Sequence, residues 1–269
     1  FIIMTKLLAI NNSFGPKGHD HSIAYYDGEV HYLKVERIRG IKRYAFKNEA
    51  DIWDTVFDHF GLVPGELDAI AYVGEPIGVQ AYPISHHIAH SLSAMTDCDL
   101  SIVIDGISED GWWSVYEGYY QRGNGKNDLS GPAKGSIGEG LIYTGRRMNL
   151  QGHDLDLAGK LMSLQSYGKV NQGLLEQFRE ITINEMFQID RLDLDILATI
   201  HKRCEEIVFR IFDDFVLDNT AKIVYSGGVA QNIVWNTELR RRYPNLIIPP
   251  HCGDEGLSLG ALQWLRKEI

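Results

Sequence analysis

A pair of histidines, His86 and His90, stands four residues apart in the segment HHIAH. On an α-helix, such residues lie on one face, one turn apart, so both imidazoles can bind the same metal ion. The spacing alone also fits two polar surface histidines, because short motifs of this kind arise by chance. We interpret His87, between them, as a supporting or structural residue. The pair is therefore half of a candidate metal site that other side chains must complete.

Two aspartates are the candidates to complete it. Asp105 ends an apolar run at residues 100–105, and α/β folds bind ligands at the carboxyl ends of their strands. A simple turn aspartate before Gly106 is the alternative. Asp254 lies in PPHCGDEG, where two prolines stiffen the chain and two glycines permit close approach, although it could merely cap the final helix. Two imidazoles and two carboxylates would hold zinc or ferrous iron with positions open for substrate.

Three further segments could hold an anion. The turn SGGVAQN at residues 226–232 joins a predicted strand to a predicted helix, and N–H groups at a helix start favour phosphate or a ribose. Tight strand–helix packing is the alternative for its glycines. The loop NNSFGPKGHDHS at residues 11–22 offers backbone donors that suit a phosphate or carbamate. The run ERIRGIKR at residues 36–43 is either a solvated basic face or a binding patch for an anionic ligand.

Apolar periodicity predicts the elements that must position these segments. Strands are predicted at 7–11, 22–26, 30–35, 67–73, 100–105, 112–119, 221–225 and 246–248. Helices are predicted at 49–60, 86–94, 192–217, 230–242 and 255–268, within a region that is mostly helical from 138 to 215. Residues 122–134 are predicted to be a mobile loop. A strand, a glycine-bearing turn and a second strand occur twice, about ninety residues apart, which indicates two related halves. We place their boundary between lobes 1–98 and 99–269.

Composition narrows the class of protein. The chain has 269 residues, of which 44% are hydrophobic and 23% charged, as in an ordinary globular protein. A net charge of −10 disfavours non-specific nucleic-acid binding but leaves room for a pocket that takes one nucleotide. The three cysteines form no CxxC pair, which favours reduced thiols in a cytoplasmic protein. The sequence has no signal-peptide pattern and no apolar run long enough to span a membrane. We therefore do not expect this chain to bind or cross a membrane.

In order along the chain, these segments resemble the O-carbamoyltransferases of the nodulation and antibiotic-tailoring type. They are also similar to the tRNA threonylcarbamoyl-transfer domain and the hydrogenase-maturation carbamoyltransferase. The matching stretches are GHDHSIAYYDGEV, VERIRGIKR, HHIAHSLSA, IVIDGISEDGWWS, SIGEGLIYTG with AGKLMSLQSYGK, SGGVAQNIVWNTEL and PPHCGDEGLSLGAL. The resemblance implies an α/β fold of the actin/sugar-kinase (ASKHA) type, duplicated around a central cleft.

The resemblance also implies roles for particular residues. The family's metal ligands fall on His86, His90, Asp105 and Asp254. Its adenosine-binding segment falls on Gly227, Gly228 and Asn232. His19 falls on a histidine close to the transferred group and Lys42 on a basic residue facing phosphate, while Gly138 and Lys160 line the same cleft.

The implied activity is the transfer of a carbamoyl group from carbamoyl phosphate, through carbamoyl-adenylate made with ATP, onto the hydroxyl of a small-molecule acceptor. An ATP-dependent phosphotransferase of the same fold is one alternative. Carbamoylation of tRNA or of a modified nucleobase is another, against which the acidic charge counts. A third alternative is a protein that binds ATP only to switch conformation.

Two departures from the family's pattern qualify the resemblance. The family has an arginine two residues before the lysine of its basic motif, where this sequence has Gly40; Arg39 could substitute from a shifted place. Antibiotic-type relatives also carry a YrdC-like domain that makes carbamoyl-adenylate, which this sequence lacks. Either a separate YrdC-like protein supplies that step, or this domain performs both steps, or the chain is a fragment of a longer one.

Overall fold

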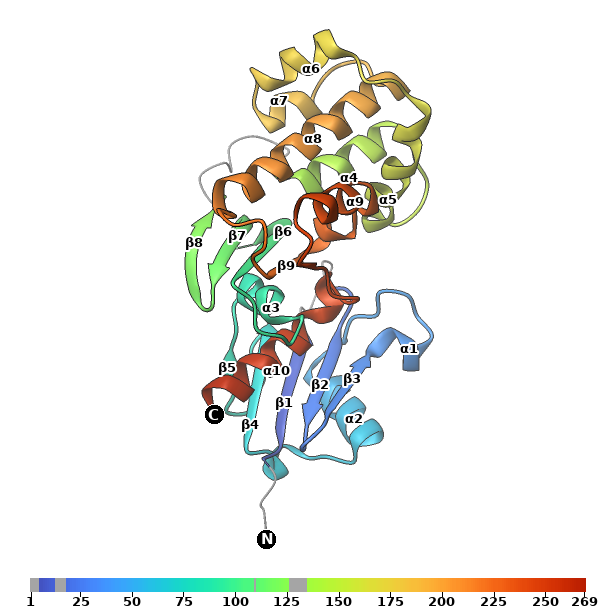
Figure 1. Ribbon diagram of the computed structural model, residues 1–269. Coiled ribbons are helices and arrows are strands. Elements are labelled where there is room, and N and C mark those ends of the chain that lie inside the picture. The colour runs from blue at the N-terminus through green and yellow to red at the C-terminus, as the bar shows by residue number, and fades with distance from the viewer. Residues whose placement is uncertain (1–4, 13–17, 109, 126–134) are drawn as a thin grey trace. The chain divides into compact units, whose positions relative to one another are not determined.

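The computed structural model describes residues 5–12, 18–108, 110–125 and 135–269 (Figure 1). The chain divides into two compact units. The first comprises residues 1–97, 224–226 and 248–269, and the second comprises 98–223 and 227–247. Residues 248–269 are predicted to belong to the second lobe, whereas their contacts group them with the first unit.

The first unit is built on a five-stranded sheet of order β3-β2-β1-β4-β5. Its strands are β1 (Leu7–Asn12), β2 (Ser22–Tyr26), β3 (Val30–Lys34), β4 (Ala69–Gly74) and β5 (Tyr82–Pro83). Its helices are α1 (Val35–Arg39), α2 (Glu49–Phe60), α3 (His86–Leu92) and α10 (Leu257–Glu268), with short 3-10 helices at Pro64–Glu66 and Asp254–Gly256. Strands β1, β2 and β3 are antiparallel neighbours, and β4 is parallel to β1.

Both faces of this sheet are covered, which explains why β1 is apolar at successive positions. Side chains alternate between the faces of a strand. Leu7 and Ala9 pack in one core with residues of α3 and α10, whereas Leu8 and Ile10 pack in another with residues of α2. The predicted strand and the predicted helix at 49–60 are therefore confirmed together.

The second unit carries its own sheet of order β10-β9-β6-β7-β8. Its strands are β6 (Leu100–Ser108), β7 (Gly111–Glu117), β8 (Tyr120–Asn124), β9 (Ile223–Ser226) and β10 (Leu246–Ile247). Its helices are α4 (Ile137–Arg147), α5 (Asp154–Leu164), α6 (Gln172–Arg179), α7 (Ile183–Phe187), α8 (Leu194–Phe215) and α9 (Ile233–Arg242), with 3-10 helices at Gln165–Tyr167 and Gly228–Gln231. The last three residues of β9 group with the first unit.

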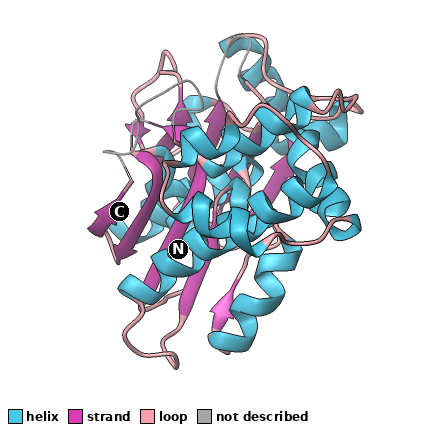
Figure 2. Cartoon of the chain, turned by 90° about the horizontal axis from the view of Figure 1, so that it is seen from above, coloured by secondary structure: helices cyan, strands magenta, loops and turns pink. Residues whose placement is uncertain are grey.

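The two sheets have the same strand order when the second is read from β8 to β10. In each, the first strand pairs antiparallel with the second and the second with the third. The repeat of strand, turn and strand expected from the sequence is therefore confirmed. Figure 2 shows the helices, strands and loops of the α/β chain in separate colours.

Some elements differ from the prediction for local reasons. Val35, predicted to end a strand, instead begins helix α1, and Gly40 ends this helix with φ 65°. The helix predicted from residue 230 begins at Ile233, because Asn232 caps it and a 3-10 turn precedes it. Strand β8 takes the start of the predicted loop at 122–134, and residues 126–134 lie outside the described part. Among the described residues, no helix combines the length and the apolar character needed to cross a membrane.

Candidate metal centre and glycine turn

Helix α3 presents the paired histidines as predicted. It begins after Ser85, whose hydroxyl accepts a hydrogen bond from the Ile88 N–H and so caps the first turn. The Nε2 atoms of His86 and His90 lie 3.2 Å apart. The side chain of His90 is fully buried, while 27% of that of His86 is exposed. One nitrogen of each ring therefore faces the same small space.

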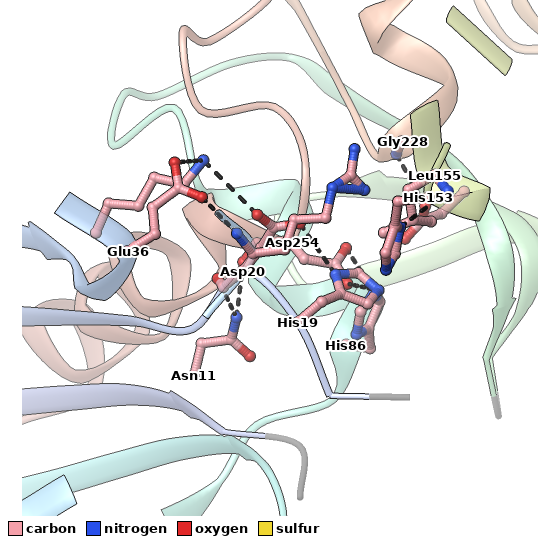
Figure 3. Close-up of polar contacts among 12 residues, drawn as sticks. Asn11, His19, Asp20, Glu36, His86, His153, Leu155, Gly228 and Asp254 are labelled. Atoms are coloured by element: carbon pink, nitrogen blue, oxygen red, sulfur yellow. Dashed lines mark hydrogen bonds and ion pairs between the residues drawn. The ribbon is translucent and has the colours of Figure 1, made fainter. Parts of the chain in front are cut away.

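Asp254 meets this pair from a distant part of the sequence. Its Oδ1 lies 3.4 Å from His90 Nε2 and 3.6 Å from His86 Nε2 (Figure 3). The residue begins the 3-10 helix that leads into α10. Asn11, at the end of β1, donates from Nδ2 to the main-chain oxygen of Asp254 at 2.8 Å. The backbone that carries this carboxylate is thus fixed to the central strand of the sheet.

These three side chains fit a divalent metal ion. Ligand bonds of about 2.1 Å in tetrahedral geometry place donor atoms about 3.3 to 3.4 Å apart. The separations among His86, His90 and Asp254 are 3.2, 3.4 and 3.6 Å. Two imidazoles and a carboxylate are also the donors that zinc and ferrous iron accept.

His19 lies beside the same carboxylate. Its Nε2 is 3.7 Å from Asp254 Oδ2, and its Nδ1 is 3.0 Å from Asp20 Oδ2. Asp20 has φ 55°, an uncommon conformation for a residue with a side chain. Its main-chain oxygen accepts a hydrogen bond of 3.2 Å from Asn11 Nδ2, the same amide that holds Asp254. A single asparagine therefore connects the segments that carry His19 and Asp254.

The charge around Asp20 favours its ionised form. Burial by itself would raise the pKa of this carboxyl, but the hydrogen bond from His19 and the positive charges of His19, Lys34 and Arg43 lower it overall. Lys34 Nζ lies 3.7 Å from Asp20 and 3.2 Å from Glu36. An ionised Asp20 accepts the Nδ1 proton of His19 and leaves Nε2 as the nitrogen that can take up a proton.

Asp105 belongs to the second unit and lies within β6, which continues to Ser108 and does not end at Asp105 as predicted. Its Oδ1 accepts a hydrogen bond of 2.8 Å from the Gly228 N–H. A Cβ on Gly138, in the first turn of α4, would be 3.7 Å from the Asp105 main-chain oxygen. The structure thus brings Asp105, Gly138 and Gly228 together. That Asp105 joins the three first-unit donors stays a prediction.

Gly227 can only be glycine. Its φ is 96°, and a Cβ there would be 2.3 Å from the main-chain oxygen of Ile104. Asn232 follows, and its Oδ1 caps α9 by accepting from the N–H groups of Val234 and Trp235. Its Nδ2 lies 3.1 Å from Nε2 of His201. Burial lowers the pKa of His201 to about 4, with a smaller contribution from the charge of Lys202.

The basic residues predicted to serve the site lie at the surface. Lys42 is exposed in the turn after α1. Lys160, on α5, is exposed and donates to the main-chain oxygen of Gln151. The Arg39 guanidinium contacts Asp51 Oδ1 at 2.9 Å and the Thr55 hydroxyl at 2.8 Å, so it connects α1 to α2. Their roles toward a nucleotide or a phosphate stay predictions.

The sequence reasoning did not single out Asn11 or Asp20, although both shape the site. Their signals are weak but present. Asn11 is a polar residue at the end of an otherwise apolar strand, and only 2% of it is exposed. Buried amides need partners, so such a residue points to loops that it must hold. Asp20 is adjacent to His19, which makes it the nearest acidic partner available to that imidazole.

Comparison with known proteins places the chain in a family. The family described as "Carbamoyltransferase N-terminus" matches residues 85–262, which include the histidine pair, both aspartates and the glycine turn. The chain therefore belongs to the carbamoyltransferases.

Two curated relatives agree with this assignment. Nodulation protein U of Bradyrhizobium diazoefficiens is 24% identical over 271 residues, covering 81% of this chain and 45% of that protein. An uncharacterized protein of Methanocaldococcus jannaschii is 33% identical over 110 residues, covering 40% of this chain and 21% of that protein. The matched regions thus span less than half the length of either relative.

Solved structures support the fold. HypF of T. kodakarensis superposes with a TM-score of 0.56 and 14% identity, covering 98% of this chain and 48% of that one. Component A of (R)-2-hydroxyglutaryl-CoA dehydratase from Acidaminococcus fermentans superposes with a TM-score of 0.54 and 14% identity, covering 97% of each chain. With the repeated strand order, these likenesses establish the actin/sugar-kinase (ASKHA) type of α/β fold predicted from the sequence.

Proposed function

We propose that this chain transfers a carbamoyl group from carbamoyl-adenylate, formed with ATP and carbamoyl phosphate, onto a hydroxyl of a small-molecule acceptor. The observation that supports the proposal most strongly is the convergence of His86, His90 and Asp254, with His19 beside them, in a carbamoyltransferase. Asp105 would complete the ligand set, and the turn at Gly227 and Gly228 with Asn232 would hold the adenosine.

A divalent iron or zinc ion held by these ligands would stabilise the negative charge that develops on the carbamoyl oxygen. The residues of the chain would do the remainder. His19 would take the proton of the acceptor hydroxyl at Nε2, because its Nδ1 is engaged with Asp20. The hydroxyl oxygen then bonds to the carbamoyl carbon, the bond from that carbon to the phosphate oxygen breaks, and AMP leaves.

Lys42, Gly138 and Lys160 would bind or line the path of the phosphate groups. Both lysines have long side chains at exposed positions, so reorientation toward an anion costs little packing. The acidic net charge of −10 favours a small acceptor over nucleic acid. A separate YrdC-like protein, or a further domain, would supply the adenylate if this chain does not make it.

The test is mass spectrometry of products after incubation of the purified chain with ATP, carbamoyl phosphate and a panel of hydroxyl compounds, with and without a YrdC-like protein. We expect a mass gain of one carbamoyl group on an acceptor in the wild type and its loss in His90→Ala. A carbamoylated product in metal-free His90→Ala would end the proposal. Phosphorylated products with Mg²⁺ alone would favour the phosphotransferase alternative instead.

A further inference from the structure

The hydroxyl of Ser226 is tied to the helix that carries the histidine pair. Ser226 Oγ donates a hydrogen bond of 2.8 Å to the main-chain oxygen of His90, and both residues are fully buried. Ser226 is the last residue of β9, and the next residue, Gly227, begins the glycine turn. A residue adjoining the proposed nucleotide segment therefore touches the backbone of a proposed metal ligand in the first unit.

The other end of the turn holds a second proposed ligand. Within the second unit, the Gly228 N–H donates to Asp105 Oδ1 at 2.8 Å. A Cβ on Gly228 would lie 2.9 Å from that same oxygen, so a larger residue there would displace the Asp105 carboxylate. Ser226 thus supports His90 within the first unit, and Gly228, two residues later, supports Asp105 within the second.

Helix α3 has little freedom to absorb a shift of Ser226. A Cβ on Gly260 of α10 would lie 1.7 Å from the Ala89 main-chain oxygen, so the two helices are in close backbone contact. Ser93 also donates to the His90 oxygen, from Oγ at 2.8 Å. A helix packed this closely moves as a body, because well-packed interiors deform little. Movement at residue 226 would therefore reach the imidazole of His90.

We propose that Ser226 and Gly228 are positioning residues for the metal ligands, through which nucleotide binding and metal binding strengthen each other. This inference rests on the proposed function, which supplies both ligands. A nucleotide that restrains the turn would restrain His90 through Ser226 and Asp105 through Gly228, each within its own unit, so less motion is left for metal binding to restrict. By reciprocity, the bound metal raises the affinity for the nucleotide by the same factor.

The experiment is a titration of the protein with Co²⁺, followed by its visible absorption bands, with and without a non-hydrolysable ATP analogue. The result is the ratio of the two Co²⁺ dissociation constants within each variant, which cancels any general loss of affinity. We expect a ratio of about 10 in the wild type, within the usual range of coupling. Ser226→Ala should bring it close to 1, and Ser226→Cys, which keeps the size and a weak donor, should lie between.

Ser93→Ala is the matched control. It removes a hydrogen bond of equal length to the same His90 oxygen, but from the residue that ends α3 and not from β9. The ratio of the two Co²⁺ dissociation constants should stay at the wild-type value in Ser93→Ala. An unchanged ratio in Ser226→Ala, or an equal loss in Ser93→Ala, would overturn the inference.

The wild-type result separates this inference from the proposed function. If the wild type binds Co²⁺ and the nucleotide analogue with a ratio of 1, the positioning role alone is overturned. If it binds neither, the proposed function fails and the inference fails with it. Thermal unfolding of each variant without ligands shows whether it is folded, and Ser226→Cys provides the readout if Ser226→Ala does not fold.

Discussion

Oδ1 of Asp254 lies 3.4 Å from Nε2 of His90, although the two residues come from different ends of the chain. The strand that carries Asn11 fixes the Asp254 backbone, and helix α3 fixes the imidazole. The candidate centre is therefore organised by the fold, which makes its ligands individually testable.

Removing the charge of Asp254 should weaken metal binding while leaving the fold intact. Asp254→Asn keeps the size and one oxygen but loses the negative charge that attracts a divalent ion. Replacing a residue that only hydrogen-bonds to a metal ligand lowers metal affinity by about 10–100-fold. Asp254 is proposed as a direct ligand, so we expect a loss of at least this size. Isothermal titration with Zn²⁺ measures it. Asp97→Asn, which changes an exposed carboxylate paired with Lys267, is the control and should bind as the wild type does.

A methyl group at Gly260 should disturb the histidine helix. Gly260→Ala would place a Cβ atom 1.7 Å from the main-chain oxygen of Ala89. Ala89 lies between His86 and His90 in the sequence, so the helix that carries both imidazoles must shift. We expect the free energy of unfolding to fall by about 1–3 kcal/mol, as for overpacked cores, and metal affinity to fall with it. Gly159→Ala on α5 has open space and should instead stabilise by up to about 1 kcal/mol. Urea denaturation compares them, and equal stabilities for the two variants would contradict the packing argument.

Acid should destabilise the second unit through His201. Burial lowers the pKa of this imidazole from 6.5 to about 4. Between these values the unfolded chain binds a proton that the folded chain does not, so stability falls as the pH drops from 6.5 toward 4. The full effect is about 3 kcal/mol. Urea midpoints at several pH values should fall less steeply for His201→Gln, whose side chain does not titrate in this range. If the urea midpoints of the wild type and His201→Gln fall in parallel as the pH drops, the role given to His201 is wrong.

Gly40 should resist replacement by the arginine that the family carries at this position. Its φ of 65° ends helix α1, and a side chain there costs about 1 kcal/mol. Gly40→Arg should therefore lower the free energy of unfolding by that amount, and Gly40→Asn by less. Gly65→Ala, which has open space and no positive φ, serves as the control. An arginine variant as stable as the wild type would show that the turn can rearrange.

The helix and the strand that carry site residues could be predicted from the sequence more readily than the contacts between those residues. The spacing of His86 and His90 predicted one helical face, and the apolar run before Asp105 predicted its strand, because both patterns are local. The contact of Asp254 with the histidines has no local signal in the sequence: the residue type made Asp254 a candidate, and only the family resemblance implied that it joins the pair. Asn11 and Ser226 were not recognised as supports, since a hydrogen bond to a distant main-chain oxygen leaves no spacing to read.

The misplaced boundaries have a similar cause. Val35 is predicted to end a strand because it continues the pattern of residues 30–34, whereas it begins a short helix that ends at Gly40. The carboxyl-terminal helix was assigned to the second lobe by its place in the chain. Its apolar face instead packs on β1 and β4 through residues such as Leu262 and Leu265, a tertiary preference that periodicity cannot assign to one sheet over another.

The most direct test of the central claim is the stoichiometry and affinity of Zn²⁺ or Fe²⁺ binding by the purified chain, compared between the wild type and His86→Ala. His86 is partly exposed, so its replacement should spare the fold, and His31→Ala removes an exposed imidazole outside the group as the control. We predict one ion per chain in the wild type and in His31→Ala, and loss of tight binding in His86→Ala. A wild type that binds no ion, or a His86→Ala variant that binds it equally well, would contradict the account.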